Sequence, residues 1–218
     1  LILGTAFALY TVSLAMTDVI HAILLFYLTP VWSTLAGWVL LGERITATRI
    51  IAVILGFAGL WALLGGGGVP LPRNAGDWLA LLSGLLWSAG TLRSFARPSQ
   101  GIALPVFCFA GGGLAASAVL LVIASALSLP MAAVSNLLPV LPWIVLLAIA
   151  IFMPPNFLVL WAAQRMDPGR IGILLMTEVL VGSISAGLLA GEAYGASEAI
   201  GTALIVTAGL VEVWGRRS

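Results

Sequence analysis

Apolar residues fill this chain in long runs that short polar stretches separate. Eight runs are predicted to form membrane helices, since a helix of about 20 apolar residues crosses a bilayer. The predicted helices are 1–16, 19–41, 45–64, 77–97, 104–127, 140–164, 168–190 and 197–214. The first is short for a span and starts with Leu, so we expect the chain to begin inside a helix. The pattern predicts an all-α polytopic membrane protein.

The polar residues that bound these runs repeat at an interval of 149 residues. Residues 18–43 begin with Asp and end with Gly-Glu, and residues 167–192 do the same. In both copies a short polar turn and another apolar run follow, with a slip of one residue between the copies. Such duplication of membrane helices is typical of secondary transporters.

A stretch with four consecutive glycines and two prolines, within residues 65–76, is predicted to link the two repeats. Three predicted helices precede it, in 1–64, and five follow it, in 77–215. The interval of 149 places the counterpart of the first helix after the linker upstream of residue 1. We therefore expect two helices and part of a third to be absent here, and ten helices in the intact protein.

The arginines cluster at one end of the predicted helices. Eight of the nine lie in alternate turns and at the C-terminus, as Arg44, Arg49, Arg93, Arg97, Arg165, Arg170, Arg216 and Arg217, whereas Arg73 lies at the other end. Positively charged flanks stay in the cytoplasm, so we expect a cytoplasmic C-terminus. Five helices per repeat is an odd number, so the two repeats are predicted to insert in opposite orientations.

Composition excludes several classes of protein. The chain is 61% hydrophobic and 8% charged, against roughly 25% charged for a soluble domain. A net charge of +1 offers no basic surface for nucleic acid. With one His and one Cys, a metal site, a haem site or an internal disulfide is not expected, and neither is a cofactor. The expected partners are the lipid bilayer and a small-molecule substrate.

Residues 29–32 (Thr-Pro-Val-Trp) and 40–46 (Leu-Leu-Gly-Glu-Arg-Ile-Thr) resemble the repeated signature of the drug/metabolite transporter superfamily, EamA-like branch. Residues 178–192 and 200–210 resemble its second copy. The resemblance implies ten helices in two inverted five-helix repeats around a central cavity. It also implies efflux of amino acids, metabolites or cationic drugs across the bacterial cytoplasmic (inner) membrane.

Glu178 is the first candidate site residue, because it lies about 12 Å along its helix from Arg170. Ionisable groups inside a membrane usually face a cavity or a partner. Glu178 is predicted to contact the amino or cationic part of a substrate, or to take up a proton. The alternative is a structural Glu that is protonated or hydrogen-bonded between helices. The second copy in the resembling family commonly reads Glu-Pro, whereas Val179 follows here.

Prolines interrupt two of the predicted helices. Pro154 and Pro155 lie midway along 140–164, and Pro30 lies midway along 19–41. Each proline leaves a main-chain carbonyl without its helical donor. These segments are predicted either to act in gating, with Asn156 as a polar contact in the cavity, or to be permanent packing kinks.

Four aromatic residues lie deep in the predicted helices: Tyr10, Tyr27, Trp32 and Trp87. Tyr hydroxyls and Trp N–H groups need partners when they are buried, and aromatic faces bind cations. As a group they favour an aromatic or cationic substrate, although ordinary helix packing explains each one alone. His21 is a candidate for a substrate contact or a pH-sensitive contact, or it is an interfacial residue beside a helix cap.

Three classes of function fit a chain of this kind. We expect a secondary transporter that works by alternating access through a central cavity. The alternatives are a membrane enzyme acting on lipid or prenyl substrates and a non-transporting subunit of a membrane complex. An enzyme is not expected, because the three Asp residues are scattered at helix ends. The pattern leaves open whether the protein is a monomer or a homodimer.

Overall fold

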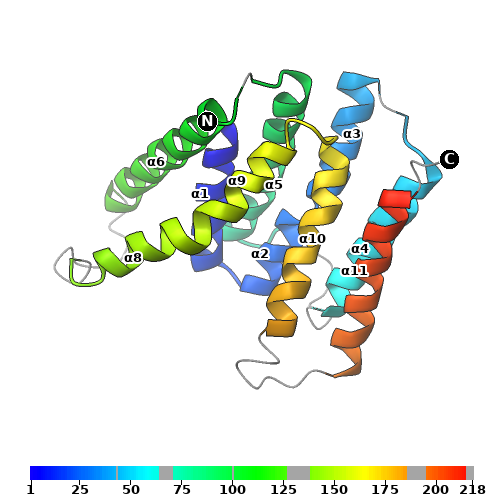
Figure 1. The fold of residues 1–218 in the computed structure, drawn as a ribbon. Coiled ribbons are helices and arrows are strands. Elements are labelled where there is room, and N and C mark those ends of the chain that lie inside the picture. Colours follow the sequence, from blue (N-terminus) through cyan, green and yellow to red (C-terminus); the bar gives the residue numbers. More distant parts are fainter. Residues whose placement is uncertain (43, 64–70, 100, 127–137, 186–194, 215–218) are drawn as a thin grey trace.

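The computed structural model describes residues 1–42, 44–63, 71–99, 101–126, 138–185 and 195–214, and within these ranges it has helices and no strands. The helices are α1 (Ile2–Met16), α2 (Val19–Phe26), α3 (Thr29–Leu41), α4 (Ala47–Leu63), α5 (Ala75–Ala96), α6 (Ala103–Ala126), α8 (Leu141–Leu147), the π-helical η1 (Ala148–Phe152), α9 (Met153–Ala162), α10 (Pro168–Ser185) and α11 (Ala196–Trp214). Figure 1 shows their arrangement. The all-α prediction is confirmed.

Four helical stretches in the described ranges are long and apolar enough to cross a membrane. They are His21–Leu41, Ala75–Ala96, Ala103–Ala126 and Leu141–Ala162, and shorter apolar helices occupy Ile2–Met16, Ala47–Leu63 and Ala199–Glu212. All of these lie where the hydrophobic pattern predicts spans. The chain is therefore a multi-pass membrane protein.

The predicted helix 19–41 is broken between α2 and α3. Pro30 lacks the N–H that would bond to the Phe26 carbonyl in a continuous helix. Instead, the Thr29 hydroxyl donates to the Phe26 carbonyl at 2.5 Å. The residue before the proline thus supplies the donor that the proline removes, so the break can lie in the apolar interior.

The predicted helix 140–164 is also irregular, because the π-helical turn η1 lies just before Pro154 and Pro155. The widened turn accommodates the two missing N–H donors. Asn156 stabilises the same place, since its side-chain amide donates to the Phe152 carbonyl at 2.9 Å. The π-helical turn lies next to the prolines that the sequence analysis singled out. The proposed role of this segment in gating stays a prediction.

Gly42 ends α3 in the left-handed conformation, with φ of 68°. A residue with a side chain is strained in this conformation, which explains why the first Gly-Glu pair has glycine at position 42.

Several other features of the sequence lie outside the described residues: Glu43, the second Gly-Glu pair at 191–192, linker residues 65–70, Arg216 and Arg217.

The helices within and directly after the two copies of the sequence motif, at residues 18–43 and 167–192, run in opposite directions. In Figure 1, α2 and α3 lead upward and α4 returns downward, whereas α10 runs downward and α11 returns upward. Helices α4 and α11 pack against each other so closely that a Cβ on Gly59 would lie 2.8 Å from the Gly201 carbonyl oxygen. A Cβ on Gly201 would lie 2.7 Å from the Gly59 carbonyl oxygen. Glycine at both positions allows this backbone contact.

Two sets of contacts define the two ends of the bundle. At one end, Arg49 bonds to Asp167, and the Ser99 hydroxyl lies 2.9 Å from the side-chain oxygen of Gln164. At the other end, Thr17 bonds to Asp77. The first set brings together turns that carry the described arginines other than Arg73. We call this the arginine-rich end.

Candidate functional site

Side chains from three helices form an aromatic cluster in the core, made of Tyr10 on α1, Phe26 and Tyr27 at the end of α2, and Trp87 on α5. The Tyr10 and Phe26 ring centroids lie 4.4 Å apart. Phe26 also meets Tyr27 at 5.4 Å and Trp87 at 6.1 Å in edge-to-face contacts. The structure thus brings three predicted residues together around Phe26, which the sequence analysis missed. Phe26 could have been identified from the sequence, because it lies just before the break at Thr29 and Pro30.

Glu178 on α10 lies beside this cluster. The Tyr27 hydroxyl donates to the Leu175 carbonyl at 3.0 Å, one turn before Glu178. The Glu178 carboxylate is close enough to interact electrostatically with both Tyr10 and Tyr27. Tyr27 is buried, whereas Glu178 is exposed. A carboxylate that solvent can reach therefore lies at the edge of an aromatic surface, an arrangement suited to an organic cation.

Two tryptophans carry buried N–H groups that find no acceptor among the described residues. They are Trp87 in the aromatic cluster and Trp32 on α3. Buried donors are normally paired, so each one has a hydrogen bond to offer to water or to a bound molecule. Trp32 does not belong to the aromatic cluster, and its predicted place in one substrate site stays a prediction.

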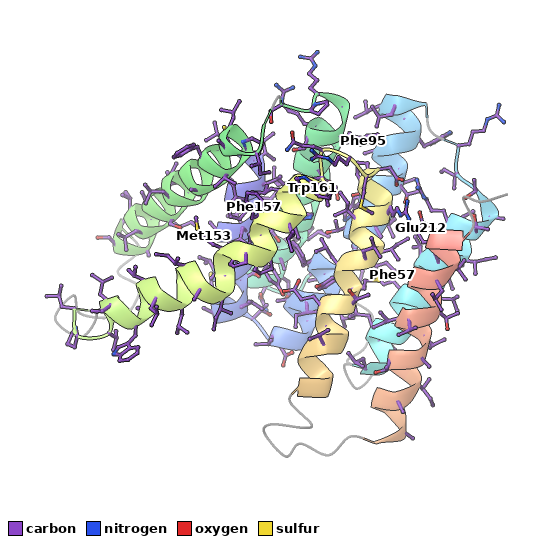
Figure 2. All side chains as sticks on the ribbon, in the orientation of Figure 1. Phe57, Phe95, Met153, Phe157, Trp161 and Glu212 are labelled. Atoms are coloured by element: carbon purple, nitrogen blue, oxygen red, sulfur yellow. The ribbon has the colours of Figure 1, made fainter. Side chains whose placement is uncertain are left out.

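Asn156 and the two prolines lie in a different part of the bundle from Glu178. Asn156 and Pro154 line an apolar cavity of about 290 Å³ between α6 and α9. A neighbouring cavity of about 400 Å³ has Arg93, Arg97 and Gln164 in its wall and shares Phe109 and Leu160 with the first. Figure 2 shows Met153 and Phe157 along this segment. Neither cavity is lined by Glu178 or the tyrosines.

His21 has a structural partner rather than a place beside Glu178. Its Nδ1 lies 3.0 Å from an oxygen of Asp77, whose side chain is fully buried. The Thr17 hydroxyl donates to the same oxygen at 2.6 Å, and the Arg73 main-chain N–H donates to the other oxygen at 2.8 Å. We call Thr17, His21, Asn74 and Asp77 the Asp77 cluster, because Asn74 also donates to Thr17.

The sequence analysis missed a buried ion cluster at the arginine-rich end, formed by Arg49, Asp167 and Glu212. One terminal nitrogen of Arg49 donates to Asp167 at 2.6 Å and to Glu212 at 3.2 Å. Figure 2 labels Glu212 near the end of α11. We call these three residues the Arg49 cluster. An acidic residue inside the apolar run of α11 was a signal, because such residues normally face partners.

The described residues contain no group of three or more His, Cys, Asp or Glu side chains that could hold a metal ion. Beside Glu178 lie the two phenols of Tyr10 and Tyr27, and the Trp87 indole meets them through Phe26. These groups bind and orient a molecule through charge, hydrogen bonds and ring faces.

Comparisons with known proteins agree with this architecture. Residues 1–65 match the model of the EamA-like transporter family, which confirms the resemblance in the first copy of the signature, at residues 29–46. A solved structure titled "Crystal structure of protein" superposes with a TM-score of 0.73 at 23% identity, over 99% of this chain and 74% of that chain. At this identity the likeness shows the fold alone. No curated protein matches the chain. The family match indicates a membrane transporter.

Proposed function

We propose that this chain is a secondary transporter that exports a small cationic or aromatic metabolite or drug by alternating access. The observation that carries the proposal is Glu178, an exposed carboxylate halfway along α10 that interacts with Tyr10 and Tyr27. The carboxylate attracts the cationic group of the substrate, and the aromatic cluster packs against its apolar part. Binding energy of this kind does not require a metal or a nucleotide.

The inverted course of the two repeats supports the mechanism. Transporters of this architecture move one repeat against the other around a site near the middle of the membrane. We propose that 1–64 and 77–215 are the two repeat portions, and that the breaks at Pro30 and at Pro154–Pro155 allow the helices to bend. The aromatic cluster joins α1 and α2 of the first portion to α5 of the second.

Further proposals follow from the sequence and the family. The arginine-rich end lies in the cytoplasm of a bacterium, as the positive-inside rule indicates. The C-terminus is then cytoplasmic, and Glu178 lies within the bilayer of the inner membrane. Export follows from the family resemblance.

A flux measurement with the full-length protein in proteoliposomes tests the function. Amino acids, nucleosides and quaternary cations are offered without added metal or nucleotide. We expect flux of a cationic or aromatic compound, and we expect Glu178→Gln to reduce it by about tenfold or more, since it removes the charge and keeps the shape. Thr177→Val is the matched control, because the Thr177 hydroxyl bonds within its own helix to Leu174 at 2.6 Å.

Two results would contradict the proposal. Equal flux in the wild type and in Glu178→Gln, with both proteins inserted in equal amount, would remove Glu178 from the binding site. Turnover of a lipid or prenyl substrate in place of flux would favour the membrane-enzyme alternative.

A further inference from the structure

The Arg49 cluster joins three helices that belong to both repeat portions. Arg49 lies in the first turn of α4, Asp167 directly precedes α10, and Glu212 lies near the end of α11. The three residues are 8%, 0% and 5% exposed, respectively. Charged residues are rarely so buried unless they are paired, and here two carboxylates share one guanidinium nitrogen.

Two members of the cluster lie on a closely packed helix pair. Arg49 is on α4 and Glu212 is on α11, and these helices contact each other backbone to backbone at Gly59 and Gly201. Asp167 comes from α10, the helix that carries Glu178. The first turn of α10 packs closely against Arg49, since a Cβ on Gly169 would lie 3.4 Å from the guanidinium carbon.

The second carboxylate has a specific physical consequence. Separating a buried ion pair is strongly unfavourable when it leaves one charge without a partner. If α10 moves away, Arg49 keeps Glu212 on the neighbouring α11. Asp167 also keeps a role, since its oxygen accepts the Arg170 main-chain N–H at 3.0 Å and caps α10. After Arg49 and Asp167 have separated, Arg49 therefore still pairs with Glu212, and Asp167 still accepts the Arg170 main-chain N–H.

We propose that the Arg49–Asp167 salt bridge is a releasable contact that closes the arginine-rich end of the transport path, with Glu212 holding Arg49 when the contact opens. The inference rests on the proposed alternating access, because it assigns one of the contacts that must break when the repeats move. It also links that end to the substrate site, since α10 carries both Asp167 at its start and Glu178 at its middle.

An apolar layer directly under the Arg49 cluster provides a reporter. Ala52 on α4, Ile173 on α10 and Ala208 on α11 form a buried group one to two turns further along these helices. If α10 moves away from α4 and α11, Ala208 loses the cover of Ile173. A cysteine at position 208, in a chain whose natural Cys108 is replaced by Ser, then becomes reactive toward a membrane-impermeant maleimide.

The test measures the alkylation rate of Ala208→Cys in membrane vesicles of the full-length protein, with the reagent applied from each side. From the arginine-rich side, we expect Asp167→Asn to raise the rate by about tenfold. Asparagine still caps a helix, so this variant keeps the fold. Arg49→Gln is expected to have the same effect and provides the second variant should Asp167→Asn fail to insert.

For Glu212→Gln we expect the alkylation rate of Ala208→Cys to change in the opposite direction. This substitution removes the carboxylate that holds Arg49 in the open state and leaves the Arg49–Asp167 bond intact, so we expect the rate to fall by about threefold or more. Arg44→Gln, an exposed arginine near the same end, is the control and should leave the rate unchanged. A second reporter, Ala80→Cys in the buried group Ala22–Leu25–Ala80 at the other end, should not respond to Asp167→Asn.

Two outcomes would overturn the inference. One is an unchanged rate in both Asp167→Asn and Arg49→Gln. The other is that Glu212→Gln raises the rate as Asp167→Asn does, or that the Ala80 reporter responds equally, because the cluster would then only hold the helices together. The assay needs no substrate, so it gives its answer independently of the flux test of Glu178.

Discussion

Each end of the bundle contains a buried carboxylate, and different kinds of partner stabilise it at the two ends. At each end a buried carboxylate lies above a small apolar layer, Asp167 over Ala52–Ile173–Ala208 and Asp77 over Ala22–Leu25–Ala80. Asp167 pairs with the full charge of Arg49 on another helix. Asp77 instead accepts from a hydroxyl, a main-chain N–H and an imidazole. The first arrangement includes a charged contact between distant parts of the chain, whereas several hydrogen bonds to uncharged donors hold the second carboxylate.

The duplication makes this difference informative. Asp18 and Asp167 occupy corresponding positions, and each accepts the main-chain N–H three residues later, from His21 at 3.3 Å and from Arg170 at 3.0 Å. Both copies thus keep the helix cap. Asp167 is also bound to Arg49 on α4. At the other end the buried carboxylate with long-range contacts is Asp77. This difference agrees with the proposal of a releasable contact at the arginine-rich end.

The largest expected effect comes from Asp77→Asn. The amide nitrogen would face donors that now bond to a carboxylate, so hydrogen bonds from Thr17, Arg73 or His21 are lost in a buried site. We expect a loss of stability of about 2–4 kcal/mol, measured as a lowered midpoint of thermal unfolding in detergent. Asp167→Asn, which keeps its cap, should lose less. A larger loss for Asp167→Asn would contradict the contrast between the two ends.

Glycine substitutions should rank the rigidity of the two ends. A Cβ on Gly76 would lie 2.9 Å from the Met16 main-chain carbon, whereas a Cβ on Gly169 would lie 3.0 Å from the Thr34 hydroxyl oxygen. Backbone cannot move aside as readily as a side chain. We expect Gly76→Ala to cost about 1–3 kcal/mol and Gly169→Ala to cost less, in the same unfolding measurement. An equal loss of stability in Gly76→Ala and Gly169→Ala would show that the packing at the two ends is equally rigid.

The smallest effect is expected for Arg73→Gln. Only the main-chain N–H of Arg73 bonds to Asp77, and glutamine keeps that group. We expect a change within about 0.5 kcal/mol, against a clear loss of stability in Arg49→Gln, whose side chain makes the ion pairs. A marked destabilisation by Arg73→Gln would mean that the Arg73 side chain, and not its backbone, holds Asp77.

The parts of the fold that the sequence predicts are those set by local physics. Membrane helices follow from the length of apolar runs, and the kinks follow from Pro30 and Pro154–Pro155, because a missing N–H acts within one turn. The αL conformation of Gly42 and the caps at Asp18 and Asp167 are equally local. The opposite insertion of the two repeats is a prediction from the odd number of helices in each, and the arginines at the helix ends predict which end is cytoplasmic.

The candidate site was only partly predictable. Glu178, Tyr10, Tyr27 and Trp87 were chosen because each lies deep in a span, and the structure brings them together. Asn156 satisfied the same criterion but bonds to Phe152, and His21, chosen for its titration near neutral pH, lies against Asp77. Depth along a helix is fixed by sequence position, whereas the direction in which a side chain faces depends on neighbouring helices.

By itself, the sequence predicted where the described helices lie, which polar motifs recur at an interval of 149 residues, and at which helix ends the arginines gather. Only the tertiary structure decided that Arg49 would meet Asp167 and Glu212, positions 118 and 163 residues away along the chain. It also decided that Phe26 would connect the aromatic side chains beside Glu178. The reason is physical: helix formation and membrane insertion depend on short segments, but the pairing of buried charges and rings depends on which helices pack together.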